Sequence, residues 1–574
     1  MPTHKPPTVH LARRVYFRNE NDPLQRAMAA LGWREEPKVA NAAIIWDVET
    51  LADTPFNGGD PPQPHQILTK LPAMLHCCRK AVFAYIVSRQ RALLPPDSPL
   101  DDGRYIPAQW ALPLQAAELA AHVQAAADAA RKKGRPAPTY IVKPDGGSQG
   151  DGITLTPDPC GQRSWDASKE RVVQEYVAQP LLLDGLKFDL RLYVLVTSVV
   201  PLRAYLCHEG LARFAVSDYV APSKDNIRDV HMHLTNYSLN KKAEGFKHSD
   251  AADGGDDGSK RTVSSVFAAL KASGQVEDVD ALWEEIGRLV GRSLAVLQPI
   301  LSSARTDQPC FKVLGFDVLL DHRARPWLIE INDHPSLRID LSWDEPGQYS
   351  MNGLNSIPSP VDETIKVPML TDALRIVGEV VQRQGKGRRQ RKRLTSLPRQ
   401  GGDAGGVYGT LYHQVQLDES ELDSLSLLHT LQRLFEEHTP ASSKREQAER
   451  LSTAHYANNE PFALPGFRWK GAQPFNAFLQ AGGLLPARGS SAARQGVVQR
   501  HDVDLIVLSV CGKGGSMDVL AFGEACAKVA RKLWPDRENA TTFELLTALI
   551  ERHYPSAMVV AEEEDEESGD EVAE

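Results

Sequence analysis

The apolar and polar residues of this chain alternate in two different rhythms. Short apolar runs bounded by turn residues are typical of β-strands, and longer stretches with apolar residues every three or four positions are typical of amphipathic helices. The runs expected to be strands are 14–17, 42–46, 171–177, 188–200 and 202–206, and the stretches expected to be helices are 24–33, 65–96, 114–133, 279–301 and 365–382. Strands and helices are therefore interspersed as far as residue 382, which indicates an α/β chain.

One pair of expected strands also carries candidate chemistry. The apolar runs 313–320 and 327–331 flank a polar turn, which predicts a β-hairpin. Asp317 belongs to its first strand, and Glu330 and Asn332, two residues apart, share one face of its second. An Asp facing them from the neighbouring strand completes a site of oxygen ligands only, which suits Mg²⁺ rather than zinc. The alternative interpretation is a solvated sheet face with incidental acids.

A glycine-rich segment lies much earlier, between two further apolar runs. Lys143 stands near the end of the first run, and a loop with four glycines follows before the chain becomes apolar again at Ile153. Glycine lets backbone N–H groups approach an anion closely and permits positive φ angles. The spacing matches neither the phosphate loop of P-loop NTPases nor the Rossmann turn. Alone, such a hairpin is only a turn in most proteins. Together with the downstream hairpin, it indicates a phosphate-binding loop.

Composition limits the classes of function. Hydrophobic residues make up 42% of the 574 residues and charged residues 24%, as in globular proteins, and the net charge of −9 is too small to drive binding to nucleic acid or membranes. No apolar run is long enough to span a bilayer, and the amino terminus lacks the apolar core of a secretory signal. The seven cysteines are scattered and form no C-x-x-C pair, which favours a reduced cytoplasmic protein. We therefore expect roughly three or four structural units and neither a nucleic-acid nor a membrane partner.

Changes in composition indicate where domains begin and end. The segment 383–399 contains eight basic residues and no acid. It is interpreted either as a disordered linker or nuclear-import signal, or as an electrostatic contact for a polyanion. The tail 562–571 is almost wholly acidic, and we expect it to be disordered. The expected domains are 10–135 (amino-terminal part of the core), 136–205 (central part with the glycine-rich loop), 206–382 (part with the candidate Mg²⁺ site), 383–405 (basic linker), 406–556 (mostly helical accessory domain) and 557–574 (acidic tail).

Several short motifs in a fixed order carry a family resemblance. They are LGW at 31–33, LPAM at 71–74 followed by RK at 79–80, YIPAQWALP at 105–113, IVKP at 141–144 with its glycine loop, QEYV at 174–177, GLKFDLRLYV at 185–194, EGLARF at 209–214, HLTNYSLN at 233–240 and the hairpin up to Asn332. With these motifs, the chain resembles the tubulin tyrosine ligase-like family of the ATP-grasp superfamily over residues 10–380. The resemblance implies an ATP-grasp fold, in which mixed sheets sandwich ATP, followed by the mostly helical extension.

The family joins an amino acid to a protein carboxylate, usually on tubulin tails. The resemblance therefore implies ATP and Mg²⁺ as cofactors, phosphorylation of a carboxylate, and attack of an amine on the acyl phosphate. The motifs at 185–191 and 233–240 look most like the glutamylase branch, so we expect a polyglutamylase that transfers free glutamate onto glutamate side chains or chains of tubulin. We expect a monomer that acts on microtubules of the cytoplasm and cytoskeleton, including those of a cilium, flagellar axoneme or basal body. The alternatives are a glycine ligase, a glutamylase of another protein, and a cytoskeletal or axonemal scaffold with accessory ligase activity. The acidic tail resembles tubulin tails, and it is either a solubilising tail or a pseudosubstrate or site of self-modification.

Roles of single residues follow from their positions in the motifs. The residues expected to bind the nucleotide are Lys143, Gly146, Gly147, Ser148, Gln149, Gly150, Gly152, Gln174, Glu175, Tyr176, Val177, Lys187, Asp189 and Asn236. The residues expected in catalysis are Arg191, Arg213 and Lys187, and those expected to hold Mg²⁺ are Asp317, Glu330 and Asn332. His233, Thr235 and Asn236 are expected to line the acceptor pocket. The alternatives are ordinary salt bridges for the two arginines, a solvent-facing side chain for Glu175 and a packing role for His233.

Two features depart from the family pattern. The chain continues from Asn332 into Asp333 and His334, an additional acid and a histidine beside the candidate Mg²⁺ site. Alternation directs Asp333 to the opposite sheet face, so we expect it to have a structural role. The segment after Arg79 and Lys80 lacks the acid that is usual in the family, which weakens the assignment of Lys80 to the nucleotide.

Overall fold

The computed structural model describes residues 7–11, 22–46, 63–146, 150–161, 169–241, 243–255, 258–304, 308–342, 356–384, 411–440, 468–470, 472–486, 497–511 and 516–557. The expected strand 14–17, the loop residues Gly147, Ser148 and Gln149, nearly all of the basic linker and nearly all of the acidic tail lie outside these ranges. The chain divides into two compact units. The first contains Met1–Ala84, Tyr105–Gly291 and Thr306–Gln416, and the second contains Tyr85–Arg104, Arg292–Arg305 and Leu417–Glu574.

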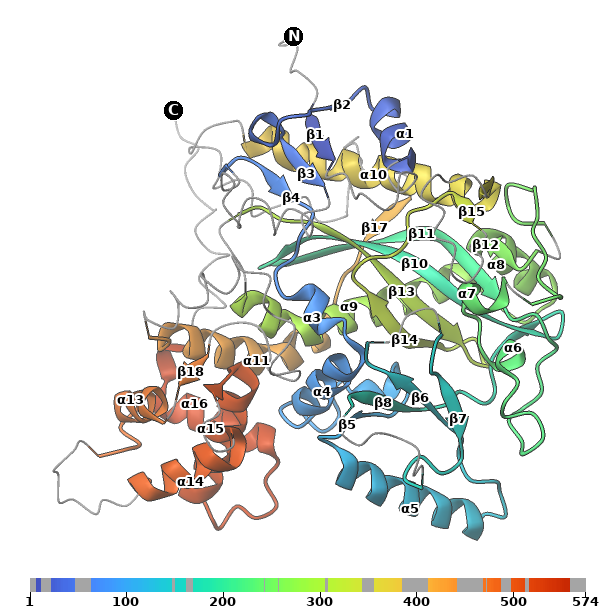
Figure 1. The fold of residues 1–574 in the computed structure, drawn as a ribbon. Coiled ribbons are helices and arrows are strands. Elements are labelled where there is room, and N and C mark those ends of the chain that lie inside the picture. Colours follow the sequence, from blue (N-terminus) through green and yellow to red (C-terminus); the bar gives the residue numbers. More distant parts are fainter. Residues whose placement is uncertain are drawn as a thin grey trace. The chain divides into compact units, whose positions relative to one another are not determined.

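The largest sheet of the first unit is built around two long antiparallel strands, β10 (Leu186–Val199) and β11 (Leu202–Phe214) (Figure 1). β11 continues well beyond the expected strand 202–206. β12 (Lys260–Thr262) pairs with β11, whereas β13 (Lys312–Leu320) and β14 (Pro326–Asn332) extend the sheet on the side of β10. β13 and β14 form the hairpin that the apolar pattern predicts. Because β10 pairs with β13, the 185–194 motif lies directly beside that hairpin.

A second sheet of this unit carries the glycine-rich loop. Its strand order is β5-β8-β6-β7, with β5 at Gln109–Leu112, β6 at Tyr140–Pro144, β7 at Thr154–Thr156 and β8 at Arg171–Glu175. The helix α5 (Ala116–Lys132) packs on this sheet, where Leu119 joins a buried cluster with Trp110 and Val173. The loop joins β6 to β7, and the expected adenine hinge is the end of β8. A strand-length apolar run and a glycine loop therefore give a β-hairpin here, as the sequence predicts.

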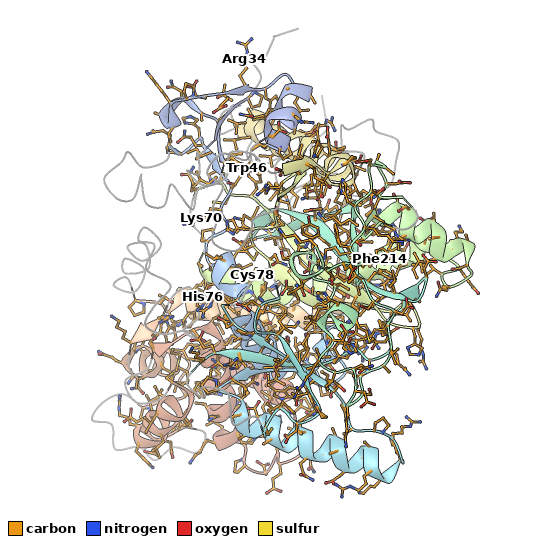
Figure 2. All side chains as sticks on the ribbon, turned by 45° about the vertical axis from the view of Figure 1, so that its right-hand side comes forward. Arg34, Trp46, Lys70, His76, Cys78 and Phe214 are labelled. Carbon is orange, nitrogen blue, oxygen red and sulfur yellow. The ribbon has the colours of Figure 1, made fainter. Side chains whose placement is uncertain are left out.

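A third, parallel sheet lies near the amino terminus. It has the order β2-β1-β3-β4, with β1 at Thr8–Leu11, β2 at Arg34–Glu35, β3 at Ile44–Trp46 and β4 at Ile67–Leu68. The helices α1 (Asp22–Ala30) and α10 (Pro360–Gln384) share a buried cluster with this sheet and with β10 and β11. Trp46, labelled in Figure 2, packs edge-on against Phe311 with ring centroids 5.7 Å apart. This apolar cluster joins the amino-terminal sheet to the large one.

The large sheet gains one more strand from a distant part of the chain. β17 (Tyr412–Gln414) pairs with β11, so the predicted accessory domain 406–556 includes a strand of the core sheet. Tyr412 is buried in the cluster just described, and the backbone N–H of Leu411 donates to the Asp372 carboxylate of α10 at 2.9 Å. The other elements of this unit are α3 (Met74–Cys77), β9 (Leu182–Leu183), α6 (Val230–His233), α7 (Tyr237–Asn240), α8 (Val263–Ala272), β15 (Asp340–Ser342) and β16 (Ser356–Pro358).

The second unit is mostly helical, as the pattern over 406–556 predicts. Its helices beyond the core are α11 (Glu419–Glu437), α13 (Gln473–Ala481), α14 (Arg500–Cys511), α15 (Val519–Leu533) and α16 (Thr542–His553), and its short strands are β18 (Trp469–Lys470) and β19 (Ser516–Met517). Phe435, Trp469, Phe478 and Phe522 form its aromatic core. The helices α4 (Lys80–Arg91) and α9 (Val279–Ser303) each contribute residues to both units. Among the described residues, no helix is both long enough and apolar enough to cross a bilayer.

Candidate active site

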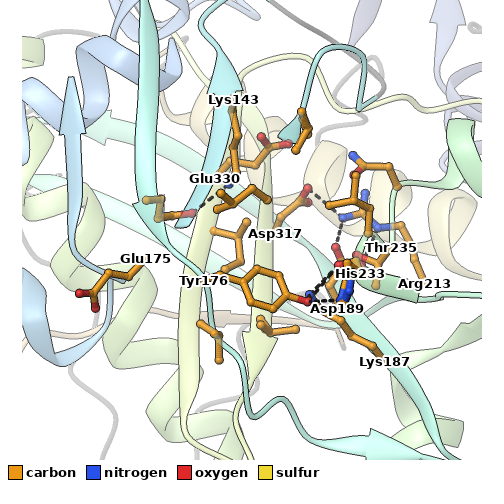
Figure 3. Close-up of a pocket in the computed structure, with 18 residues that line it drawn as sticks. Lys143, Glu175, Tyr176, Lys187, Asp189, Arg213, His233, Thr235, Asp317 and Glu330 are labelled. Atoms are coloured by element: carbon orange, nitrogen blue, oxygen red, sulfur yellow. Dashed lines mark hydrogen bonds and ion pairs between the residues drawn. The ribbon is translucent and has the colours of Figure 1, made fainter. Parts of the chain in front are cut away.

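A pocket of the first unit is lined by residues of the second sheet, which carries the glycine-rich loop, and by residues of the large sheet (Figure 3). The lining residues are Ile141, Lys143, Ile153, Gln174, Glu175, Tyr176, Val177, Lys187, Asp189, Arg213, His233, Leu234, Thr235, Asn236, Asp317, Leu319, Ile329 and Glu330. Motifs far apart in the sequence therefore meet here. Among the described residues expected at the site, Gly146, Gly150, Gly152, Arg191 and Asn332 do not line the pocket. Arg191 and Asn332 contact the lining residues Asp317 and Glu330, respectively.

Two arginines and two aspartates form a buried ionic network at one wall. Arg213 of β11 donates from Nε to the Asp189 carboxylate at 2.8 Å and from Nη2 to Asp317 at 2.9 Å. Arg191 of β10 also donates two hydrogen bonds to the Asp317 carboxylate, one from Nε and one from Nη2 at 3.0 Å. Burial works to raise the pKa of Asp317, but the two guanidiniums outweigh it and hold that pKa well below its usual range. Asp317 is therefore a carboxylate anion. Its hydrogen bonds hold the guanidinium groups of both arginines in fixed orientations.

Gly315 makes the grip of Arg191 possible. A Cβ atom at this position would come within 2.9 Å of Pro335 Cβ and 3.2 Å of Arg191 Cδ. A glycine on β13 therefore leaves the space through which the Arg191 side chain reaches Asp317.

The three expected Mg²⁺ ligands lie at neighbouring levels of the hairpin. Asp317 is directly opposite Glu330, and Gly315 is opposite Asn332, whose Nδ2 donates to Glu330 at 3.3 Å. A carboxylate offers about four acceptor positions, and the arginines use three of those on Asp317, so one direction remains for a cation. Two carboxylates and an amide oxygen suit Mg²⁺. The described residues contain no group of three His, Cys, Asp or Glu side chains that could hold a metal ion, and this site has two carboxylates and one amide.

Two lysines enter the pocket from opposite sheets. Lys143 of β6 donates to Gln174 Oε1 at 2.9 Å, and Lys187 of β10 donates to the Tyr176 hydroxyl at 3.0 Å and to the His233 carbonyl at 2.8 Å. Burial is the main cause that lowers the pKa of Lys143 to about 8 and that of Lys187 to about 7. Two desolvated amines that regain charge beside an anion are suited to a polyphosphate.

The expected hinge places its side chains on both sides of β8. Gln174 is buried in the pocket, and Tyr176 packs with Ile141 and Leu234 in an apolar cluster. The Glu175 side chain is directed away from the lysines, as Figure 3 shows, and its carboxylate lies 2.8 Å from His122 Nε2 on α5. Any contact of Glu175 with a nucleotide is therefore left to its backbone.

The glycine loop meets the 233–240 motif. Gly150 has φ of +85°, and a Cβ atom there would lie 2.5 Å from Leu239 Cδ1 and 3.4 Å from Asn236 Cγ. Gly152 has φ of +69° and would bring a Cβ atom within 2.9 Å of Pro144. Only glycine combines this backbone conformation with such close packing. Gly146 opens the loop, and the expected contacts of Gly147, Ser148 and Gln149 lie outside the described residues.

His233 is fully buried and bonded through both ring nitrogens. Nδ1 lies 3.3 Å from the Tyr176 hydroxyl and Nε2 lies 3.1 Å from the Asn226 carbonyl, while its own carbonyl accepts from Lys187. Burial and the nearby lysine lower the pKa of His233, which favours the neutral ring. The ring thus fixes its neighbours, and His233 lines the pocket together with Thr235.

The sequence pattern did not single out the apolar walls of the pocket. Ile141 lies two residues before Lys143, and Leu319 lies two residues after Asp317, so each shares a strand face with a charged site residue by simple alternation. That spacing was the available signal. Ile153 and Ile329 complete the apolar lining.

The additional pair Asp333 and His334 forms a cluster with Lys312. The Asp333 carboxylate lies 2.9 Å from His334 Nδ1 and 3.3 Å from Lys312 Nζ, and the lysine also lies 2.9 Å from His334 Nε2. These contacts tie the chain that leaves β14 to the first residue of β13. They agree with the expected structural role of Asp333.

Comparison with known proteins gives one consistent relationship. The model of the tubulin-tyrosine ligase family matches residues 60–346. The tubulin polyglutamylase TTLL11 of Mus musculus is 37% identical over 375 residues, which are 63% of this chain and 48% of the relative, and the Homo sapiens protein of that name is 36% identical over the same length, with 63% and 49% covered. A probable beta-tubulin polyglutamylase of Tetrahymena thermophila is 34% identical over 343 residues, which are 58% of this chain and 26% of the relative. The chain thus spans about half the length of the TTLL11 relatives. The family resemblance and the ATP-grasp fold class expected from the motifs are confirmed, and the chain belongs to the tubulin-tyrosine ligase family.

Proposed function

We propose that this protein is an ATP-dependent polyglutamylase that joins free glutamate to glutamate side chains, or to existing glutamate chains, on tubulin. The observation that carries the proposal is the pocket in which Lys143, Lys187, Arg213, Asp317 and Glu330 converge. The relatives named above, two tubulin polyglutamylases and one probable beta-tubulin polyglutamylase, support glutamate as the amino acid and tubulin as the acceptor.

The pocket residues divide into two groups toward Mg–ATP. Lys143, Lys187 and the glycine loop hold the phosphates, and the segment 174–177 holds the adenine against the apolar side chains of Ile141 and Leu234. Asp189 and Asn236 complete the nucleotide side. Asp317, Glu330 and Asn332 would hold Mg²⁺, which supplies positive charge at the transferring phosphoryl group when it is bound.

The proposed reaction has two steps. An oxygen of the acceptor carboxylate attacks the γ-phosphorus, the bond to the leaving ADP breaks, and an acyl phosphate forms. The amine of the incoming glutamate then attacks the acyl carbon, inorganic phosphate leaves with the former carboxylate oxygen, and the amine gives up a proton as the amide forms. Each step moves negative charge across the pocket, so fixed cations accelerate it by electrostatic stabilisation.

Arg191 and Arg213 supply fixed cations for these steps. Each guanidinium is oriented by a carboxylate, and the bonds of Arg213 to Asp189 and Asp317 use Nε and Nη2, so these two acids do not engage Nη1. A held fork needs little reorganisation when it meets a phosphate or carboxylate. We assign the two arginines, together with Lys187, to catalysis at the acyl phosphate, and Thr235 to the acceptor side, with Asn236 between the nucleotide and the acceptor.

The biological setting belongs to the same proposal. We propose that the protein acts as a monomer on the acidic tails of tubulin in microtubules, within the cytoskeleton, including that of cilia. The tubulin polyglutamylase names of the relatives support the cytoskeletal setting.

The decisive experiment uses purified protein, Mg–ATP, microtubules and isotope-labelled glutamate, glycine or tyrosine in separate reactions. Mass spectrometry of the tubulin tails is expected to show added glutamate only. Glu330→Gln is expected to abolish the addition, whereas Glu285→Gln, which removes a surface ion pair with Arg288 on α9, is expected to leave it unchanged. Glycine addition, or no addition to tubulin by a protein that hydrolyses ATP, would reject the proposal.

A further inference from the structure

The base of the glycine loop is tied to the start of another helix. Asp145 follows the last residue of β6 and precedes the first loop glycine, and its carboxylate is almost fully buried, with the side chain 2% exposed. One carboxylate oxygen accepts from Arg79 Nε at 2.7 Å, and the other accepts from the backbone N–H of Ala81 at 2.7 Å. Ala81 is the second residue of α4, so the carboxylate also neutralises the positive end of that helix.

Arg79 bridges two strands where their ladder ends. The last paired residues of β6 and β8 are Pro144 and Arg171, and the backbone N–H of Asp145 adds one more bond to the Glu170 carbonyl at 3.2 Å. The Arg79 guanidinium then contacts the side chains of both Asp145 and Glu170. The ladder is therefore closed by an ionic bridge at the point where the loop begins.

The same helix start also approaches the candidate metal site. Lys80 Nζ lies 3.6 Å from the Glu330 carboxylate, so successive residues of one short segment contact the loop base and an expected Mg²⁺ ligand. At the other end of the loop, Gly152 packs against Pro144. Both ends of the loop are thus held to β6, and Asp145 is its fixed starting point.

We propose that Asp145 is a positioning residue for phosphate binding: held by Arg79 and by the Ala81 N–H, it fixes the backbone at the base of the glycine loop and directs Lys143 toward the phosphates of ATP. This inference rests on the proposed function, because it takes the pocket to bind ATP. Asp145 touches no substrate in this assignment. Because the negative charge of Asp145 is paired with Arg79, its carboxylate does not repel the phosphates as an isolated carboxylate would.

The test separates phosphate positioning from general stability. Equilibrium binding of a non-hydrolysable ATP analogue with Mg²⁺, and of adenosine, is measured by calorimetry or competition for the wild type, Asp145→Asn, Asp145→Ala and Arg79→Lys. Asn retains an acceptor for the Ala81 N–H and Ala retains none, so we expect affinity for the ATP analogue to fall about three-fold and about ten-fold or more, respectively. Arg79→Lys keeps the charge but loses the fork, and we expect it to resemble Asp145→Asn. Adenosine, which has no phosphates, should bind with unchanged affinity in every variant.

The control is Glu285→Gln, which removes an ion pair in the same unit and should change neither affinity. Wild-type affinity for the ATP analogue in folded Asp145→Ala or Arg79→Lys, or an equal loss for the analogue and adenosine, would overturn the positioning role. If the wild type itself fails to bind the ATP analogue, the proposed function fails instead. If the wild type binds the analogue but transfers no amino acid, only the ligase assignment fails, and the comparison between variants still decides the role of Asp145.

Discussion

Under the proposed function, we expect the two buried lysines to make ATP binding depend on pH. Burial is the main cause that lowers the pKa of Lys187 to about 7 and that of Lys143 to about 8. A bound polyphosphate stabilises the ammonium forms, so each lysine that is neutral in the free protein takes up a proton when ATP binds. Affinity is therefore greatest below the free-state pKa values and falls as the pH rises through them.

The size of the effect follows from these pKa values. If both lysines are charged in the complex, the apparent Kd contains one factor for each lysine. That factor is one plus the ratio of the neutral to the charged form of the lysine in the free protein. Raising the pH from about 7.5 to about 8.5 then weakens binding about 25-fold, or ~1.9 kcal/mol. At about pH 8, Lys187 takes up about 0.9 of a proton and Lys143 about 0.5.

Calorimetry of a non-hydrolysable ATP analogue with Mg²⁺, in two buffers of different ionisation enthalpy, measures both quantities. In Lys187→Arg, whose guanidinium is charged throughout this range, uptake at about pH 8 should fall to about half a proton. Lys271→Arg, at an exposed position of α8, is the control and should behave as the wild type. A constant Kd across this pH range, together with the same binding enthalpy in both buffers and hence no proton uptake, would refute the reasoning about desolvated lysines.

Substitutions at three further positions test other parts of the account. Gly315→Ala places a Cβ 3.2 Å from Arg191 Cδ, so we expect kcat to fall about ten-fold through loss of the Arg191–Asp317 grip, and steady-state kinetics with a wild-type kcat would contradict this. Glu175→Gln changes a side chain that faces His122, so the KM for ATP should stay within about two-fold, and a larger rise in a nucleotide titration would place the carboxylate in the site. Tyr412 is buried, and its hydroxyl has no hydrogen-bond partner within the described part of the chain, so Tyr412→Phe should keep the free energy of unfolding within about 0.5 kcal/mol or raise it. Tyr412→Ala should lower it by about 3 kcal/mol in urea melts, and equal effects of the two changes would argue against the packing of β17.

The sequence pattern predicted the hairpin because a hairpin depends only on residues close together along the chain. The runs 313–320 and 327–331 have the apolar character of buried strands, and the structure gives β13 and β14 nearly the same bounds. Counting along the hairpin brought Asp317 near the level of Glu330, and the observed register pairs them directly. The glycine loop was equally local, because its conformation depends on which residues tolerate a positive φ.

Contacts that depend on pairing between distant segments were not predictable in the same way. The bonds of both arginines to Asp317 require the register of β11 against β10 and of β10 against β13. The bond between Arg79 and Asp145 joins residues 66 positions apart. The orientation of Glu175 depends on α5, and the strand β17 comes from beyond the core motifs. Alternation along one strand gives the face of a residue but not its partner, so the family motifs identified the charged residues while their ion pairs came from the structure.

The most direct test of the proposed reaction follows the oxygen of the acceptor carboxylate. An acidic tubulin-tail peptide whose side-chain carboxylates carry heavy oxygen is incubated with the purified protein, Mg–ATP and glutamate, and both the peptide and the released phosphate are analysed by mass spectrometry. We predict that each amide bond formed releases one phosphate carrying one heavy oxygen, because the carboxylate oxygen attacks the γ-phosphorus and leaves with it. Glutamate addition with unlabelled phosphate would contradict the acyl-phosphate route, and labelled peptide recovered without added glutamate would contradict the assignment of this pocket as a glutamate ligase.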